Sequence, residues 1–569
     1  MEIGATEKAE KRSSSFELAI GVLAAVISTL LYVSCFPPFD VAEAAYVFAL
    51  PFLIWCFFKP RWKIYLLCAF LASWVSWFMI LIWLRHIHPP WGWLATALLA
   101  LLMTIAPLAW LSFVRWGLPR VINGAAWQRI IMMFGLAGFW ILLEWLRSWL
   151  FTGFPWLPLS ASQWQTPAML QLAAWTGHYG ISFVLIFLNL GLVFYGRSLV
   201  RQVKRRVQPK EPKPETESAR RRFDTMGQNA KPLFGGLKFA FCPEFYLSLG
   251  MLMFCFSLYI FGFKERSERE PMFRAAAVQP WIPATLKWDP DQARNNLDIL
   301  ERQTEIAALL DPDVILWPEA ATPFPILDNR DDGMLRWTER LVNTIDTNLL
   351  CGNLAILDGD LFNGVFWVRP EKGIFDEFYL KRHPVPFGEY TPFRDYLPFL
   401  DKVVPLANDI IAAEDATVIP IELNGQSWPV GFLICNEDIY PSLAREMALE
   451  GASWILVVTN DAWYGTEGGA YQHAANSVLR AVETRLPVVR CGNHGWTGWI
   501  DEFGQIRYVL TNGEGSIYFQ GAGPMNLTRS TSLVGKQSFY VKHGDWFVAL
   551  CGVFFIAAII VSRLRAQKI

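Results

Sequence analysis

The chain has 569 residues, of which 53% are hydrophobic and 18% are charged, and its mean hydropathy is +0.27. Its 50 Lys and Arg side chains nearly balance its 51 Asp and Glu side chains, which leaves a formal net charge of −1. This composition excludes a disordered tail, a basic nucleic-acid-binding protein and a secreted disulfide scaffold, and the length exceeds that of one compact domain.

Eight apolar stretches are long enough to be considered as membrane helices, because a bilayer core requires about 20 apolar residues per helix. They are Phe16–Phe36, Ala44–Phe58, Ile64–Leu84, Trp91–Val114, Ile130–Leu150, Ala168–Tyr195, Phe239–Phe263 and Trp546–Val561. Seven of them crowd the first half of the chain, which argues against the buried helices of a soluble protein. The sequence therefore predicts a polytopic membrane domain of seven spans at 1–263, and an eighth span with a tail at 544–569.

Basic residues mark alternate loops between these spans. Lys and Arg gather before the first span, after the second, fourth and eighth, and in the loop 196–238, which carries 12 of them. The intervening loops 37–43 and 151–167 carry none. Because positively charged loops stay in the cytoplasm, we expect both termini inside and residues 264–543 outside. The loop 196–238 is interpreted as a flexible cytoplasmic linker, with a contact to anionic lipids as the alternative.

Two ionisable residues fall near the outer end of the fifth span. Glu144 and Arg147 are three residues apart, so they share one face of the helix. They either pair with each other or line an aqueous entrance, and ionisable groups at membrane depth are functional candidates.

The segment 264–543 differs from the rest of the chain in charge and in pattern. It holds 24 basic and 38 acidic residues, a net charge of −14, whereas the remainder has a net charge of +13. Apolar strands are expected at Arg274–Gln279, Val314–Trp317, Leu349–Leu357, Val365–Val368, Pro429–Ile434, Trp454–Thr459, Pro487–Arg490 and near Thr497–Asp501, and amphipathic helices at Gln292–Leu310, Met334–Thr347 and Ala470–Arg485. This alternation predicts one water-facing α/β domain with buried sheets covered by helices.

Three residues of this domain carry chemistry. Glu319 follows the strand VILW, at the kind of strand end where α/β domains place reacting groups. Lys381 lies in KRHPVPFGE, whose prolines and glycine fix the backbone, and Cys435 ends the apolar run of GFLICNED. Taken alone, Glu319 could be an ordinary loop glutamate, Lys381 a surface lysine and Cys435 a core cysteine. Together they supply a general base, a cation for an oxyanion and a nucleophile.

A different arrangement of nucleophile and base is the alternative for Cys435. His383 is the nearest histidine by motif, but no Asn or Asp that would orient its ring is evident. The nine cysteines are widely spaced and include no CxxC pair, so neither a zinc site nor a redox pair is indicated.

At these motifs the chain resembles the nitrilase, or carbon–nitrogen hydrolase, superfamily. The spans add a closer resemblance, to the apolipoprotein N-acyltransferase family. The segments that carry it, besides WPE and LICNED, are FPPFD (36–40), GFPW (153–156), VQP with LKWD (278–289), KRHPVPFGEYTP (381–392) and TNDAWYG (459–465).

The resemblance implies a nitrilase-like αββα sandwich on the outer side of a bacterial inner membrane, without metal or cofactor. At matching positions it implies the catalytic residues Glu319, Lys381 and Cys435, the supporting residues Glu389 and Glu437, and the substrate-binding residues Trp288 and Asn363. Asn436, Pro384 and Phe362 depart from the family pattern, which leaves the preference for acyl chain or lipid open.

The activity that the resemblance implies is ping-pong acyl transfer through a thioester on Cys435. The acyl donor would be a membrane phospholipid, and the acceptor the N-terminal α-amine of a diacylglyceryl-cysteine apolipoprotein. Residues 393–415, rich in Phe, Leu, Pro and Val, form either a lid over the acyl chain or a packed loop. The competing functions are a membrane-anchored amidase and a transporter or scaffold with an inactive nitrilase-like domain.

Overall fold

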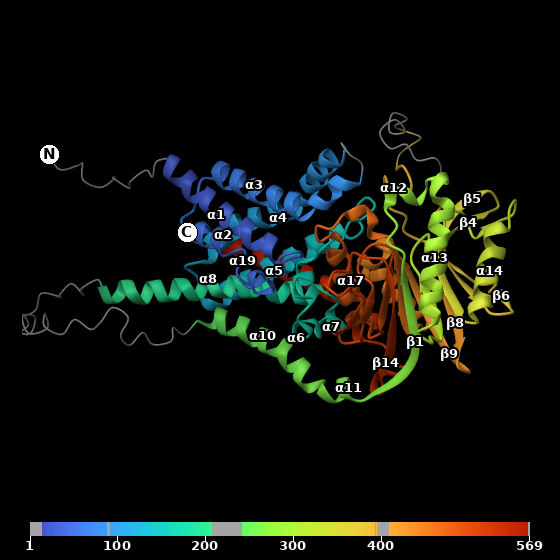
Figure 1. Ribbon diagram of the computed structural model, residues 1–569. Coiled ribbons are helices and arrows are strands. Elements are labelled where there is room, and N and C mark those ends of the chain that lie inside the picture. Colours follow the sequence, from blue (N-terminus) through green and yellow to red (C-terminus); the bar gives the residue numbers. More distant parts are fainter. Residues whose placement is uncertain are drawn as a thin grey trace, which may run out of the picture.

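The computed structural model describes residues 14–87, 91–207, 242–392, 394, 396 and 409–566. It has two parts, a bundle of long helices and an α/β sandwich, and helix α17 (Gly469–Thr484) lies between them (Figure 1). Helix α1 begins and helix α8 ends on the side of the bundle that is farthest from the sandwich (Figure 1).

Seven helices of the described chain are long and apolar enough to cross a membrane. They are α1 (Ser14–Ser34), α3 (Trp62–Ile80), α4 (Gly92–Val121), α5 (Ala126–Arg147), α8 (Tyr179–Val207), α10 (Pro243–Phe261) and α19 (Trp546–Ala566). Large apolar side chains such as Leu23, Leu98 and Ile105 point outward from them and are at least half exposed. Such a surface suits a hydrocarbon environment, and the prediction of a membrane protein is confirmed in this respect.

The expected count of eight spans is not confirmed. The second stretch, Ala44–Phe58, forms the 3₁₀ turn η1 (Ala42–Tyr46) and then the short helix α2 (Leu50–Cys56). Seven residues of α-helix rise only about 10 Å, so α2 by itself is shorter than a bilayer core, and the apolar stretch Ala42–Cys56 as a whole is shorter than the seven long helices.

The sixth stretch also differs from its prediction at both ends. Its first part forms two short helices, α6 (Pro167–Leu170) and α7 (Ala173–Thr176), and Gly177 at φ 66° then ends α7. Helix α8 starts only at Tyr179 and continues past the expected end at Tyr195 into the basic segment. The remainder of that segment, 208–238, lies outside the described residues, as do most of residues 393–415.

Small residues bring α5 and α19 close together. A Cβ atom on Gly138 would lie 2.7 Å from the carbonyl oxygen of Cys551, so only glycine permits this approach. Close backbone contact of this kind is a usual way for helices to associate in lipid.

The sandwich consists of two sheets. The first has the strand order β14-β1-β2-β4-β5-β6, with β3 beside β4 and β7 beside β5, and the second has the order β13-β12-β11-β10-β9-β8. The strands of the first are β1 (Arg269–Gln279), β2 (Val314–Trp317), β3 (Leu327–Asp328), β4 (Asn348–Leu357), β5 (Asp360–Arg369), β6 (Gly373–Ile374), β7 (Tyr379–Leu380) and β14 (Gly521–Ser530). Those of the second are β8 (Val418–Leu423), β9 (Gln426–Ile434), β10 (Trp454–Thr459), β11 (Val488–Gly492), β12 (Gly498–Ile500) and β13 (Ile506–Val509).

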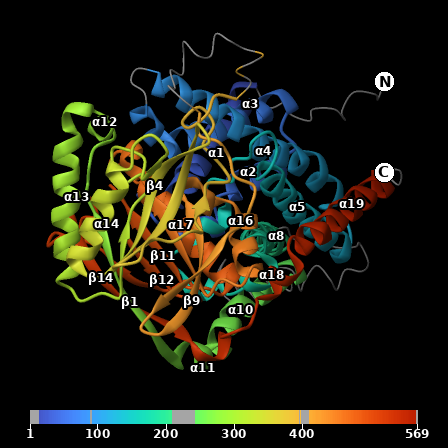
Figure 2. The ribbon, with the colours of Figure 1, turned by 90° about the vertical axis from the view of Figure 1, so that its right-hand side faces the viewer.

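Helices cover both outer faces, so the order of layers is αββα, as expected (Figure 2). Helices α13 (Ala293–Ala308) and α14 (Gly333–Ile345) pack on the first sheet, and α16 (Pro441–Leu449) and α17 pack on the second. Between the sheets, Leu316 and Leu350 of the first sheet share one core with Ile434 of the second.

Short helical elements connect these layers. They are η2 (Ile82–His86), η3 (Leu159–Gln163), α11 (Phe263–Ser267), α12 (Ala284–Lys287), η4 (Pro290–Gln292), η5 (Cys435–Ile439), η6 (Asp461–Tyr464), η7 (Thr531–Leu533) and α18 (Phe539–His543). Of these, η5 carries the cysteine singled out from the sequence.

One side chain of α17 joins the sandwich to the bundle. Gln472 is buried, its Oε1 accepts hydrogen bonds of 3.0 Å from the ring N–H groups of Trp83 and Trp156, and its Nε2 donates at 3.0 Å to the carbonyls of Pro37 and Ile80. The motifs FPPFD and GFPW thus supply docking groups for α17. Because all four bonds are buried, losing any one would leave an unpaired polar group.

Candidate active site

Strand ends bring the singled-out residues to one end of the sandwich. Glu319 lies two residues beyond β2, Lys381 directly follows β7, and Cys435 directly follows β9. Asn363 projects from β5, the strand that pairs with β7. Gly352 of β4 allows the turn before Glu319 to approach, because a Cβ there would lie 2.6 Å from the carbonyl oxygen of Pro318.

Lys381 lies at the centre of a closed polar cluster. Its Nζ is 2.8 Å from Glu389 Oε1 and 3.2 Å from Glu319 Oε1, and its side chain is fully buried. Asn363 Nδ2 donates to the same two oxygens, at 2.8 Å to Glu319 and 3.4 Å to Glu389. Burial lowers the pKa of Lys381, but the two carboxylates outweigh it and hold the pKa above its ordinary value. The amine is therefore charged at neutral pH.

Cys435 lies within electrostatic reach of this cluster. The residue is only 8% exposed, and its φ of 53° is in the left-handed region that non-glycine residues rarely adopt. Burial first, and then the charge of Glu319, raise the pKa of the thiol well above its ordinary value, while Lys381 opposes them. The resting thiol therefore keeps its proton, beside a carboxylate that can accept it.

Glu437 ties the lysine segment to the cysteine strand. Its Oε1 accepts from the backbone N–H groups of Arg382 at 2.6 Å and His383 at 3.0 Å. Its Oε2 accepts from the backbone N–H of Ile434 at 2.7 Å and from the hydroxyl of Tyr379 at 2.8 Å. Glu389 acts similarly on its own loop, because its Oε2 accepts from the backbone N–H of Val385 at 2.6 Å. Both glutamates thus hold the loop geometry around Lys381.

Two expected residues lie apart from this cluster. Trp288 is 44% exposed and has its neighbour Lys287 as its charged contact, with the amine 5.9 Å from the ring centroid. The ring of His383 stacks on Tyr440 with a centroid separation of 4.4 Å, and no hydrogen bond joins it to Cys435 among the described residues. His383 thus packs against Tyr440, whereas Glu319 acts electrostatically on the thiol of Cys435.

Lys287 is a site residue that the sequence did not single out. It is 2% exposed, and its Nζ donates at 2.9 Å to the backbone carbonyl of Glu319. Burial lowers its pKa to about 8, although Glu319 and Cys435 oppose this effect. The signal was present in the motif LKWD, where a cation stands beside Trp288, but nothing in that motif reveals the burial.

A second charged cluster, also not foreseen, supports the backbone of Cys435. His473 of α17 has its Nε2 3.1 Å from the Cys435 carbonyl and 3.0 Å from Asp438, and its Nδ1 2.8 Å from Asp461. Arg490 also pairs with Asp438. Burial lowers the pKa of His473, but Asp438 and Asp461 outweigh it and raise the pKa to about 9. A charged imidazole therefore holds the carbonyl of the strained residue.

Among the described residues, no group of three or more His, Cys, Asp and Glu side chains is placed to hold a metal ion. The reactive groups described at this end of the sandwich include a charged lysine, a carboxylate and a protonated thiol. This set can perform nucleophilic acyl transfer.

Both the helical bundle and the sandwich match the sequence profiles of known protein families. Residues 28–191 match the profile of the apolipoprotein N-acyltransferase N-terminal domain, and residues 274–518 match that of carbon-nitrogen hydrolases. An apolipoprotein N-acyltransferase of Pseudomonas aeruginosa is 30% identical over 447 residues, which cover 76% of this chain and 74% of that protein. The chain belongs to the apolipoprotein N-acyltransferase family. The Geobacter metallireducens member is 29% identical, and the match covers 95% of both chains.

Among solved structures, an amidase from Nesterenkonia sp. is similar, with a TM-score of 0.34 and 14% identity. The match covers 49% of this chain and 95% of the amidase. Saccharomyces cerevisiae Nit3, of the nitrilase superfamily, has a TM-score of 0.34 and 16% identity, over 49% of this chain and 95% of Nit3.

Proposed function

We propose that this protein transfers an acyl chain from a membrane phospholipid, through a thioester on Cys435, to the α-amine of a diacylglyceryl-cysteine apolipoprotein. The observation that carries the proposal is the buried cluster of Glu319, Lys381 and Asn363 beside Cys435. Family membership supports the same reaction, since the relatives are named for N-acylation of apolipoproteins.

In the first half-reaction, Glu319 takes the proton of Cys435 and the sulfur attacks the ester carbonyl carbon. Lys381 stabilises the oxyanion that forms, and Asn363 keeps Glu319 in position. The intermediate collapses, the C–O bond breaks, and the leaving alkoxide takes the proton from Glu319 as lysophospholipid. Preorganised donors of this kind contribute on the order of 100-fold or more to the rate each.

In the second half-reaction, the acceptor amine attacks the thioester carbonyl. Glu319 accepts a proton from the amine and returns it to the departing sulfur of Cys435, which restores the thiol. The raised pKa of that thiol favours the return, because burial disfavours a free thiolate. Ping-pong kinetics is the expected signature of such a covalent intermediate.

Trp288 is proposed as a contact for the lipid substrate, because its exposed ring lies beside Lys287, which donates to the backbone of Glu319. Trp288→Ala should raise KM for phospholipid more than it lowers kcat. A fall in kcat with an unchanged KM would assign Trp288 to the chemistry instead.

The decisive experiment is intact-mass spectrometry of the purified chain after incubation with one defined phospholipid and no acceptor. A mass gain of one acyl group at Cys435 is expected, and a lipopeptide amine should discharge it. Cys435→Ala should gain nothing, whereas Cys491→Ala, which alters another buried cysteine, should acylate normally. Transfer by Cys435→Ala, or acylation at another residue, would overturn the proposal.

We also propose that the protein lies in a bacterial inner membrane with both termini in the cytoplasm and residues 264–543 in the periplasm, as the basic loops suggest. This topology needs an eighth crossing besides the seven long helices, and we assign it to the shorter apolar stretch Ala42–Cys56 between α1 and α3. The exposed positions Leu309 and Trp127 test this arrangement. In cells with a permeabilised outer membrane, an impermeant maleimide should label Leu309→Cys. It should label Trp127→Cys, near the fourth-to-fifth helix turn, only after lysis. The reverse pattern would invert the topology.

A further inference from the structure

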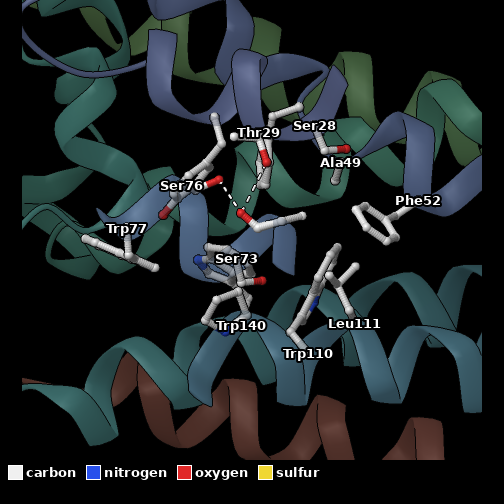
Figure 3. Close-up of a pocket in the computed structure, with 14 residues that line it drawn as sticks. Ser28, Thr29, Ala49, Phe52, Ser73, Ser76, Trp77, Trp110, Leu111 and Trp140 are labelled. Carbon is white, nitrogen blue, oxygen red and sulfur yellow. Dashed lines mark hydrogen bonds between the residues drawn. The ribbon is translucent and has the colours of Figure 1, made fainter. Parts of the chain in front are cut away.

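The space that the described helices α1 to α5 enclose is too small for an organic ligand. Its larger part amounts to about 50 Å³, which is room for a few water molecules. The hydroxyls of Thr29 and Ser76 beside it both donate to the carbonyl of Ala72, at 3.2 and 2.7 Å (Figure 3). The buried group whose surroundings indicate a further role lies in the sandwich, and it is Lys287.

Lys287 is a buried cation with few partners. The residue is 2% exposed, and within the described chain its Nζ makes one hydrogen bond, at 2.9 Å to the backbone carbonyl of Glu319. The ring centroid of Trp288 lies 5.9 Å from the amine. A buried ammonium without a carboxylate at hydrogen-bonding distance costs free energy, so an uncharged side chain would be more stable at this position. This cost indicates that the site uses the charge of Lys287.

A buried amide of the neighbouring helix fixes the backbone that carries Lys287. Asn296 of α13 is 4% exposed, and its Nδ2 donates at 3.0 Å to the carbonyl of Leu286 and at 3.5 Å to that of Lys287. The amine therefore extends to Glu319 from a backbone that is held in place.

The turn that accepts the hydrogen bond of Lys287 is strained. Ala320, which follows Glu319, has a φ of 46°, in the left-handed region that residues with a Cβ atom rarely adopt. Beyond it, the backbone N–H of Ala321 donates at 2.8 Å to the carbonyl of Gly352. Lys287 and Gly352 thus hold the two ends of the strained turn, and with it the backbone from which the Glu319 side chain extends.

The charges around Glu319 balance only when Lys287 is included. Glu319 and Glu389 share Lys381, so these three side chains carry two negative charges and one positive charge. The amine of Lys287 acts electrostatically on both Glu319 and Cys435. Burial lowers its pKa to about 8, which leaves the amine mainly charged at neutral pH. Two cations therefore face two carboxylates.

Three further groups near Glu319 are uncharged at neutral pH. The amide of Asn363 donates at 2.8 Å to its Oε1. Burial raises the pKa of the Tyr464 hydroxyl, on η6, and that of the Cys435 thiol well above their ordinary values, so both keep their protons. The positive charge that acts on Glu319 therefore comes from Lys381 and Lys287.

We propose that Lys287 is a positioning residue for the base, because it holds the backbone of Glu319 and supplies the second positive charge that favours its ionised carboxylate. Glu319 can take the proton of Cys435 only in that form. The inference rests on the proposed function in one respect, which is that Glu319 is the base for Cys435. It requires nothing of the acyl donor or the acceptor.

The test measures how fast iodoacetamide alkylates Cys435 in the full-length, detergent-solubilised protein without lipid. Peptide mass spectrometry identifies the modified cysteine, and Cys435→Ala is the blank. The rate should fall towards low pH as the base takes up a proton, and Glu319→Gln should lack this acid limb. The acid limb therefore reports the charge state of Glu319.

In Lys287→Met the acid limb should move to higher pH by about one unit, so that alkylation on its acid side becomes about tenfold slower. Lys287→Arg retains the charge and should keep the limb close to that of the wild type. Lys372→Met, at an exposed lysine between β5 and β6, is the matched control and should behave like the wild type.

A slower reaction of Lys287→Met with an unmoved acid limb would reduce Lys287 to a packing role and overturn the proposal. An unchanged rate in this variant would overturn it as well. If size-exclusion chromatography shows that Lys287→Met fails to fold, Lys287→Gln, which keeps a hydrogen-bond donor without the charge, decides the outcome by the same shift. Normal dependence on Lys287 without any thioester from phospholipid would instead contradict the proposed function alone.

Discussion

Two cations, the fully buried Lys381 in the sandwich and the partly exposed Arg147 in the helical bundle, have opposite surroundings. Lys381 has two carboxylates within 3.2 Å, whereas Arg147 has no ion pair among the described residues and borders a cavity. A buried charge persists only when another group compensates for it. The first arrangement is complete without substrate and suits chemistry, while in the second the neighbouring Glu144 bonds Trp140 and the backbone of Leu159 instead of the cation.

Removing the paired cation should have the largest effect. In Lys381→Met, Glu319 and Glu389 would remain as adjacent buried carboxylates without a cation. We expect kcat to fall by about 100- to 1,000-fold and the free energy of unfolding to fall by about 3–5 kcal/mol. Acyl transfer to a lipopeptide and chemical denaturation measure the two. Lys264→Met, at an exposed lysine, is the control, and a fully active Lys381→Met would contradict the prediction.

The charge of His473 should make stability depend on pH. Its pKa is about 9 in the folded protein, against about 6.5 in an unfolded chain. The stabilisation from its protonated form is therefore complete below pH 6.5 and is lost as the pH rises through 9. His473→Gln lacks this charge, so the difference in unfolding free energy from the wild type should be largest at pH 6 and should shrink towards pH 9.5. A difference independent of pH would show that the imidazole is held neutral.

Removing the unpaired cation should act in the opposite direction to Lys381→Met. In delipidated protein, Arg147→Gln should leave the free energy of unfolding unchanged or raise it by up to about 2 kcal/mol, since an uncompensated charge is lost. A loss of 3–5 kcal/mol would mean that Arg147 is paired after all.

The smallest effect is expected at Tyr379, whose hydroxyl is one of four donors to Glu437. In Tyr379→Phe three backbone N–H groups still hold the carboxylate, so the free energy of unfolding should fall by only about 1–2 kcal/mol. Chemical denaturation of Tyr379→Phe and of Lys381→Met in parallel measures how much the contacts of Glu437 and those of Lys381 each depend on one side chain. A loss as large as that of Lys381→Met would show that the hydroxyl is essential for the loop.

The sequence predicts the buried strands well because their chemistry is local. Strands β2 and β10 have the bounds that were expected, since a parallel strand covered on both faces forms a continuous apolar run. Strands β8 and β14 were not predicted, because each contains a proline and β14 also has two glycines, which are unusual inside strands. Their place depends on long-range pairing, such as that of β14 with β1, which no local pattern shows.

The site residues likewise include some that local sequence reveals and some that it does not. Glu319, Lys381, Asn363 and Cys435 could be placed from short motifs, and the structure brings them together. Lys287 and His473 could not, because what distinguishes them is burial beside residues distant in sequence. The form of the second apolar stretch could not be predicted for a similar reason. Hydropathy registers apolar residues but not the break between η1 and α2.

Gln472 and His473 are neighbours on α17, but they bond different parts of the molecule. One bonds four groups of the helical bundle, and the other bonds the carbonyl of Cys435. A single helical turn therefore sets the height of the sulfur above the bundle, with no flexible linker between them. Under the proposed function, this fixed height sets the depth in the leaflet at which the ester of an acyl donor can reach Cys435.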